Sequence, residues 1–119
     1  MGMLKRNEGE LQYGDRPFAV RSERTEAGER IQVLGEMDMS VTEELDREMR
    51  RAEAGDASLI VIDLAQLDFL DAAGVQLLLD LKARSDANGR RLRMTKASSP
   101  HVRRVLEVTG AGAVLPFVD

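Results

Sequence analysis

Few side chains in this sequence could carry out acid–base chemistry near neutral pH. His101 is the only histidine among the 119 residues, and it follows Pro100 in the first turn of a predicted helix, where a polar side chain usually faces solvent. Any general acid or base would have to be His101 or a carboxyl group with a shifted pKa. Ser98 and Ser99 stand just before the same helix, where a serine is explained by helix capping. We therefore interpret the chain as a protein without an active site of its own.

The sequence also gives little support for a metal site or a phosphate-binding site. The sequence has no cysteine and a single histidine, which argues against a zinc site. Asp38, Asp63, Asp68 and Asp71 lie near predicted strand ends and could together hold Mg²⁺, although carboxylates at such positions more often have ordinary roles. The sequence from Gly110 to Gly112 resembles part of a phosphate-binding loop, but it follows a helix instead of opening one and predicts a turn. We expect neither a metal ion nor a cofactor.

The composition limits the classes of partner. A net charge of −4 and a pI of about 5.1 leave no overall positive field that would attract nucleic acid or anionic lipid. The basic run from Arg90 to Arg93 alternates with the period of a strand and lacks interleaved aromatic residues, as a solvated strand face would. No apolar run approaches the roughly 20 residues of a membrane span, and the polar N-terminus lacks the apolar stretch of a signal peptide. We expect a cytoplasmic protein that binds no nucleic acid and does not insert into a membrane.

The pattern of apolar residues divides the chain into an arm and one domain. Residues 1–17 are polar, without a sustained period, and predict a flexible N-terminal arm that folding does not require. Residues 18–119 predict a single α/β domain with the element order β-β-α-β-α-β-α-β. The expected architecture is a mixed, mainly parallel sheet packed with helices.

Local signals place the first elements of this domain. A strand that begins at Phe18 ends at a turn around Ala27-Gly28, and alternate apolar residues indicate a second strand over residues 31–37. Ser40-Val41-Thr42-Glu43 has the form of a capping box, and the helix that it begins should end at Gly55.

The remaining elements follow from the same kinds of signal. The apolar, β-branched run 59–64 predicts a central strand that is covered on both faces. Helical periodicity predicts a second helix over residues 72–88, and a strand follows around residues 92–94. Ser99-Pro100 predicts the start of a third helix, with the serine as N-cap. Residues 114–118 predict a short last strand, which Pro116 places at a sheet edge.

The junction between the central strand and the second helix is the most informative segment. Asp71 is positioned to cap that helix, because its carboxylate can accept free backbone N–H groups at the helix start. Gly74, in the first turn, would allow close approach by another chain or by a ligand. Phe69 and Leu70 are apolar residues at the exit of a strand, where at least one could stay exposed. The crevice beyond the carboxyl ends of parallel strands is where open α/β sheets usually bind ligands.

Four short motifs lie in an order and spacing that are specific in combination. They are Gly35-Glu36-Met37-Asp38, Ile60-Val61-Ile62-Asp63-Leu64, Phe69-Leu70-Asp71 with Gly74, and Val108-Thr109-Gly110 followed by Val114-Leu115-Pro116-Phe117. Over about residues 18–118 the sequence resembles the STAS domain, the family of bacterial anti-sigma factor antagonists. The resemblance implies an α/β regulatory domain whose partner is an anti-sigma factor, often of the serine kinase type, and whose binding releases a sigma factor.

The resemblance also implies a phosphorylation switch, and this sequence departs from the family at that point. The family's phosphoacceptor serine falls on Ala72, and Ala73 follows it, so the position has no hydroxyl group. Three interpretations stay open: an antagonist that always binds, a switch at another residue, or a role in a different assembly. A serine-to-alanine substitution that mimics the unphosphorylated state is a further possibility.

The prediction of a partner-binding surface rests on the positions of three segments and on the family resemblance. The surface should form where the loop before the first helix, the exit of the central strand and the first turn of the second helix meet. Two other functions stay open: an accessory subunit of a lipid or sulfate transport complex, and a weak nucleotide-binding domain. The expected surface residues are Met37, Asp38, Met39, Ser40, Asp68, Phe69, Leu70, Asp71, Ala72, Ala73, Gly74 and Gln76.

Overall fold

A strand hairpin opens the part of the chain that this computed structural model describes, residues 18–118. Strand β1 (Ala19–Arg24) pairs antiparallel with β2 (Glu29–Met37). The predicted turn is present between them, closed by hydrogen bonds between Thr25 and Gly28. A Cβ atom on Gly28 would collide with the carbonyl oxygen of Leu59, so this turn requires glycine. The predicted arm over residues 1–17 lies outside the described residues.

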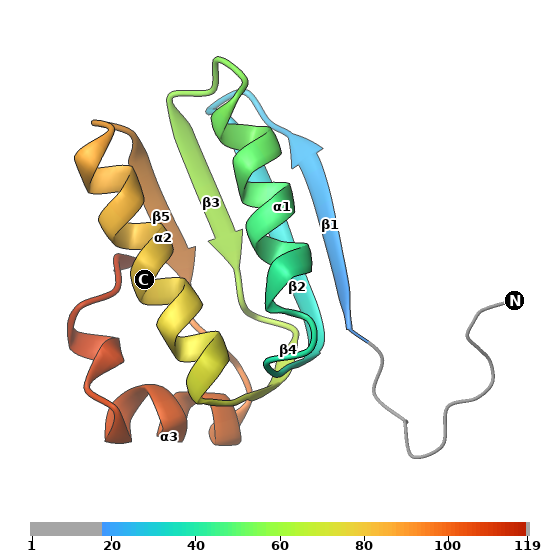
Figure 1. The fold of residues 1–119 in the computed structure, drawn as a ribbon, viewed down its shortest axis with the longest axis vertical. Coiled ribbons are helices and arrows are strands. Elements are labelled where there is room, and N and C mark those ends of the chain that lie inside the picture. The colour runs from blue at the N-terminus through green and yellow to red at the C-terminus, as the bar shows by residue number, and fades with distance from the viewer. Residues whose placement is uncertain (1–17, 119) are drawn as a thin grey trace, which may run out of the picture.

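The sheet is mixed and mainly parallel, as the sequence predicts. Its strands lie in the order β1-β2-β3-β5-β6, with β3 at Leu59–Asp63, β5 at Arg91–Thr95 and β6 at Phe117–Val118. All neighbouring pairs except β1–β2 are parallel. Strand β6 is a two-residue edge strand directly after Pro116, where a missing N–H group does least harm. Figure 1 shows the strands running side by side behind two helices.

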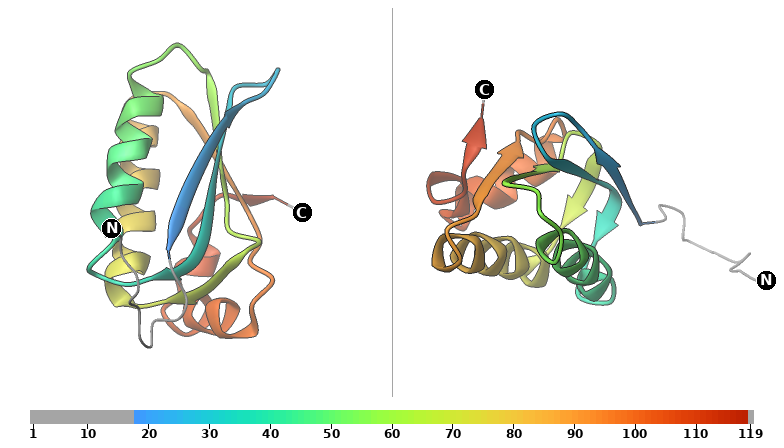
Figure 2. Two further views of the ribbon diagram at one scale, coloured as in Figure 1. Left: turned by 90° about the vertical axis from the view of Figure 1, so that its right-hand side faces the viewer. Right: turned by 90° about the horizontal axis from the view of Figure 1, so that it is seen from above.

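Three helices accompany the sheet. Helices α1 (Thr42–Glu53) and α2 (Ala72–Ala87) lie next to each other on one face of the sheet, and α3 (Pro100–Val108) lies across one end of it (Figures 1 and 2). Strand β3 is therefore not covered by helices on both faces, contrary to the prediction. Ile60 and Ile62 are fully buried, whereas Val61 between them is only half-buried. Because side chains alternate along a strand, one face of β3 is covered by the helices and the other face is open.

The core fills the space between the sheet and the helices. Its fully buried members include residues of strands β2, β3 and β5 and of all three helices, elements that the apolar pattern of the sequence predicted. The largest fully buried side chains are Ile31, Met37, Leu45, Met49, Ile60, Ile62, Leu64, Leu67, Leu70, Leu78, Leu81 and Met94.

The start of α1 differs from the predicted capping box. The helix begins at Thr42, and the residue before it, Val41, makes no side-chain cap. The backbone N–H and the hydroxyl of Ser40 instead donate to Oδ1 of Asp38, at 2.9 and 2.6 Å. The carboxylate of Asp38 thus takes the serine hydroxyl that was expected to cap the helix. Ser40 lies in a turn, and the helix begins only at Thr42.

Two small elements were not predicted. Strand β4 (Leu67–Leu70) pairs parallel with the end of β2, with a register shift between Gly35 and Glu36. The sequence predicted only a strand exit there, because this pairing depends on β2 extending beyond the end of β3. A 3₁₀ turn lies at Ala111–Ala113, and the last strand, predicted over residues 114–118, is confined to Phe117–Val118. Gly110 precedes it with φ of 81°, which confirms the predicted turn.

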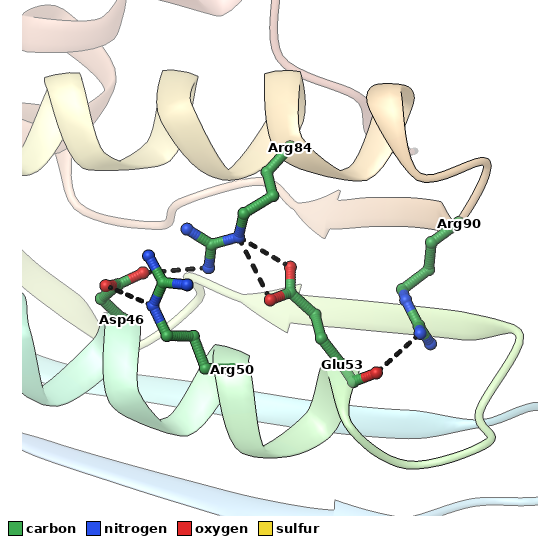
Figure 3. A network of polar contacts seen from close by, with 5 residues as sticks. All are labelled: Asp46, Arg50, Glu53, Arg84 and Arg90. Atoms are coloured by element: carbon green, nitrogen blue, oxygen red, sulfur yellow. Dashed lines mark hydrogen bonds and ion pairs between the residues drawn. The ribbon is translucent and has the colours of Figure 1, made fainter.

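An ion-pair network joins the two helices on the sheet (Figure 3). Arg84 of α2 donates through Nε to both carboxylate oxygens of Glu53, at 3.1 and 3.0 Å, and through Nη2 to Asp46 at 2.9 Å. Arg50 also donates to Asp46, at 3.1 Å, and Arg90 donates to the main-chain oxygen of Glu53 at 2.8 Å. Burial alone would raise the pKa of Asp46, but the hydrogen bonds from Arg84 and Arg50 outweigh it and lower that pKa.

Replacing Arg84 with alanine should lower the free energy of unfolding by about 1–2 kcal/mol, because two largely covered carboxylates lose their shared cation. Since the pKa of Asp46 is lowered in the folded state, this contribution is present above the ordinary aspartate pKa and is lost as the pH falls through the folded value. Urea denaturation should therefore show the deficit at pH 7 and a smaller one below about pH 4. Lys82→Ala, which removes an exposed pair with Asp86, is the control and should cost less than about 0.5 kcal/mol. Equal losses in the two variants would contradict the role of the network.

Candidate partner-binding surface

Asp71 ties three segments together at one end of the sheet. Its Oδ1 accepts a hydrogen bond from the backbone N–H of Gly74 at 2.9 Å, which confirms the predicted cap of α2. Its Oδ2 accepts from the backbone N–H of Met39 at 3.1 Å, and its own N–H donates to the carbonyl of Met37 at 3.2 Å. One carboxylate thus fixes the β2–α1 loop against the start of α2, as the predicted surface requires.

The exposed residues at this end form an apolar patch with a polar margin. Met39 is 75% exposed and gives the loop adaptable apolar area. Ala72 and Gln76 are exposed on the first turns of α2, and Ala73 is half-buried beside them. Because the N–H of Met39 is hydrogen-bonded to Asp71, this flexible side chain and the two alanines lie at the same end of the sheet.

Three residues of the predicted surface face the protein interior instead. Met37 and Leu70 are 0% and 1% exposed, so their side chains belong to the core. Gly74 is buried as well, and a Cβ atom on it would lie 2.5 Å from Cδ1 of Leu70 and 3.3 Å from Cε of Met37. The expectation that Gly74 allows a partner or ligand to approach is corrected: the glycine makes room for the chain's own core. The sequence signal for this orientation is that Leu78 and Leu81, four and seven residues later, belong to the buried stripe of α2.

Helix α3 contributes to the same end of the sheet, which the sequence analysis did not predict. His101 is exposed, as expected, and its ring stacks on Phe69 with centroids 4.9 Å apart and an angle of 9° between planes. Phe69 is half-buried. Ser99 accepts from the N–H of Val102 at 3.4 Å, which confirms it as N-cap, and its hydroxyl donates to the carbonyl of Asp68 at 3.3 Å. The only hint in the sequence was a polar ring in the first turn of the helix.

Three of the four aspartates that could have held Mg²⁺, Asp38, Asp63 and Asp71, are engaged with different partners. Asp63 is buried and pairs with Arg30, and it also accepts from the hydroxyl of Thr95 at 2.7 Å and the N–H of Ala65 at 2.9 Å. Burial would raise the pKa of Asp63, but these partners lower it. Asp38 accepts from Ser40. Among residues 18–118, no group of three or more acidic, histidine or cysteine side chains could hold a metal ion.

The basic run at the start of β5 has the predicted geometry. Arg91 and Arg93 are exposed and Leu92 between them is buried, as the strand period requires. Arg90 is engaged elsewhere, in hydrogen bonds to the carbonyls of Glu53 and Ala57. In the described part of the chain, no helix is long and apolar enough to cross a lipid bilayer.

Comparisons with known proteins agree with this fold. A family model described as "Mlab, STAS domain" matches residues 20–116. An anti-sigma factor antagonist from Mycobacterium paratuberculosis shares the fold, with a TM-score of 0.75, 23% identity and 85% of each chain covered. The unphosphorylated form of the anti-sigma factor antagonist SpoIIAA is 25% identical, with a TM-score of 0.69 and coverage of 85% of this chain and 89% of that one.

A second solved structure of the same relative shows its modified state. The Bacillus cell fate determinant SpoIIAA in its phosphorylated form is also 25% identical, with a TM-score of 0.62 and coverage of 85% of this chain and 92% of that one. No curated protein sequence matches the chain.

Proposed function

Because the chain belongs to the STAS domain family, we propose that it is an anti-sigma factor antagonist, which binds an anti-sigma factor and so releases a sigma factor. The observation that carries the proposal is the similarity to SpoIIAA over most of both chains, together with the match of the family model to residues 20–116. On this proposal the protein acts by binding and not by catalysis.

The proposed contact surface consists of the exposed or half-exposed residues at the Asp71 end of the sheet. Its apolar centre is Met39, Ala72 and Ala73, and the Phe69–His101 stack extends it toward α3. Interfaces of this kind take most of their binding energy from a few apolar or aromatic anchors that a polar rim surrounds. The contact surface is Asp38, Met39, Ser40, Asp68, Phe69, Ala72, Ala73, Gln76 and His101.

The partner is proposed to be an anti-sigma factor of the serine kinase type. Ala72 is the first residue of α2 and is exposed, so a hydroxyl at this position would be open to a kinase. A phosphate there would bring nearly two negative charges into the middle of the contact surface. Since alanine cannot be phosphorylated, we propose that partner binding by this chain is never interrupted by a phosphate on residue 72.

Incubation with the kinase-type anti-sigma factor and ATP should leave residue 72 unmodified, whereas Ala72→Ser should take up phosphate if the kinase recognises the surrounding surface. Intact-mass measurement followed by peptide mapping checks both results. Ala73→Ser, with its hydroxyl at a half-buried neighbouring position, is the matched control. Stoichiometric phosphate on Ser40 or Thr42 of the wild-type protein would show that the switch operates at another residue.

Affinity capture from native lysate tests the class of partner. We expect an anti-sigma factor to be recovered with the wild-type protein and to be lost with Ala72→Asp. Recovery of an ATP-binding-cassette subunit in its place would favour the transport-subunit alternative. Titration with labelled ATP tests the nucleotide-binding alternative, and saturable binding by the isolated chain would support it.

A further inference from the structure

A groove between α1 and α2 opens beside the contact surface. It encloses about 280 Å³, and Ala73 and Gln76 belong both to its wall and to the contact surface. Thr42 and Glu43 from the first turn of α1 form the opposite wall. Because the two helices begin at the same end of the sheet (Figure 1), the groove runs from the contact surface along the helix pair.

The lining of this groove is amphipathic. Leu77 and Ala73 are both half-buried and give it an apolar floor. Carboxylates stand around this floor: Glu43 and Asp46 on α1, and Asp80 on α2. No arginine or lysine lines the groove within the described chain.

One of the three carboxylates in the groove lining is balanced by cations, and the other two are not. Asp46 is held by Arg84 and Arg50, in the network that Figure 3 shows. Asp80 only accepts a hydrogen bond from the amide of Gln76, at 2.9 Å. Among residues 18–118, no cation pairs with Glu43 or Asp80. Within the described chain, the groove therefore presents two carboxylates that no ion pair compensates, Glu43 in the first turn of α1 and Asp80 in the third turn of α2.

The helix dipole explains only part of this charge. Glu43 lies in the first turn of α1, where a negative side chain stabilises the helix. Asp80 lies in the third turn of α2, beyond the reach of that effect, and aspartate is a poor helix former there. A cationic group in the groove would give Asp80 an ion-pair partner.

We infer that this groove receives an arginine or lysine side chain of the protein that binds the contact surface. The aliphatic stem would pack on Ala73 and Leu77, and the cationic head would lie near Glu43 and Asp80. The inference rests on the proposed function, since it assumes that the contact surface is an interface. It specifies the partner's chemistry: a basic side chain next to the area that covers Met39.

A titration with a small probe tests the groove without any partner. N-acetyl-arginine methylamide carries the charge and stem of an arginine side chain, and N-acetyl-citrulline methylamide has the same shape without the charge. In ¹H–¹⁵N spectra of the full chain, the arginine probe should shift the amides of Glu43, Ala73, Leu77 and Asp80 along a saturable curve. The citrulline probe should bind at least about threefold more weakly, as the loss of one surface charge pair predicts.

Two variants make the test specific. Asp80→Asn should weaken binding of the arginine probe by about threefold, whereas Glu26→Gln, at an exposed position in the β1–β2 turn, should leave it unchanged. Circular dichroism checks that both variants fold. Equal affinities for the two probes, shifts centred outside the groove, or unchanged binding by Asp80→Asn would each overturn the inference.

The outcome can be separated from that of the proposed function. If the groove does not bind the arginine probe but the protein releases a sigma factor, the inference about the groove is wrong and the antagonist proposal stands. If the groove binds the arginine probe but the protein releases no sigma factor, the groove is supported as a site for a basic side chain and the antagonist proposal is wrong.

Discussion

Ile62→Ala should lower the free energy of unfolding by about 2–5 kcal/mol, the range for emptying a well-packed core position. Ile62 is 0% exposed on β3, and its registered neighbours are Ile31 on β2 and Met94 on β5, both also fully buried. A side chain enclosed in this way leaves a cavity that the sheet cannot close by a small movement. Urea denaturation should show the loss as a lower midpoint with an unchanged slope.

Val61→Ala provides the matched control for this prediction. Val61 is the adjacent residue of the same strand, but it points to the open face of the sheet and is only half-buried. Its truncation should cost clearly less than that of Ile62. A cost below about 1 kcal/mol for Ile62→Ala would contradict the central position of β3.

Ala72→Asp should weaken partner binding by about 2 kcal/mol or more, which corresponds to roughly thirtyfold, because it places an unpaired charge in the contact surface. The melting temperature should change little, since Ala72 is exposed and an acidic residue suits the first turn of a helix. Isothermal titration calorimetry with the captured anti-sigma factor measures the first quantity and a thermal scan the second. Met39→Ala should weaken binding more modestly.

Arg103→Glu is the control on α3 in the same experiment. Arg103 is exposed but lies outside the contact surface, so its reversal should leave binding within a few-fold of wild type. Loss of binding in Arg103→Glu with normal binding in Ala72→Asp would place the interface on another face.

Signals that act over a few residues predicted most of the fold. The β-branched run at residues 59–64 correctly predicted the central strand, and Ser99 and Asp71 were correctly predicted as helix caps. Such signals work because the groups that cause them lie within one turn of each other. The failed capping box shows the limit of this reasoning, because Asp38 competes locally for the hydroxyl of Ser40.

The parts that sequence could not supply depend on contacts between distant segments. Strand β4 forms because β2 extends past β3, and the stack of His101 on Phe69 exists only once α3 lies across the sheet end. The orientation of Gly74 toward Leu70 likewise follows from how α2 packs on β4. The segments of the predicted surface do lie together at one end of the sheet, but the structure was needed to show which of their side chains face outward.

Release of a sigma factor tests the central claim most directly. The captured anti-sigma factor is bound to a fluorescently labelled sigma factor, and the loss of anisotropy is followed as this protein is added. The account predicts that wild-type protein releases the sigma factor along a saturable curve and that Ala72→Asp requires about thirtyfold more protein for half release. A sigma factor that stays bound at saturating wild-type protein, or that Ala72→Asp releases equally well, would contradict the account.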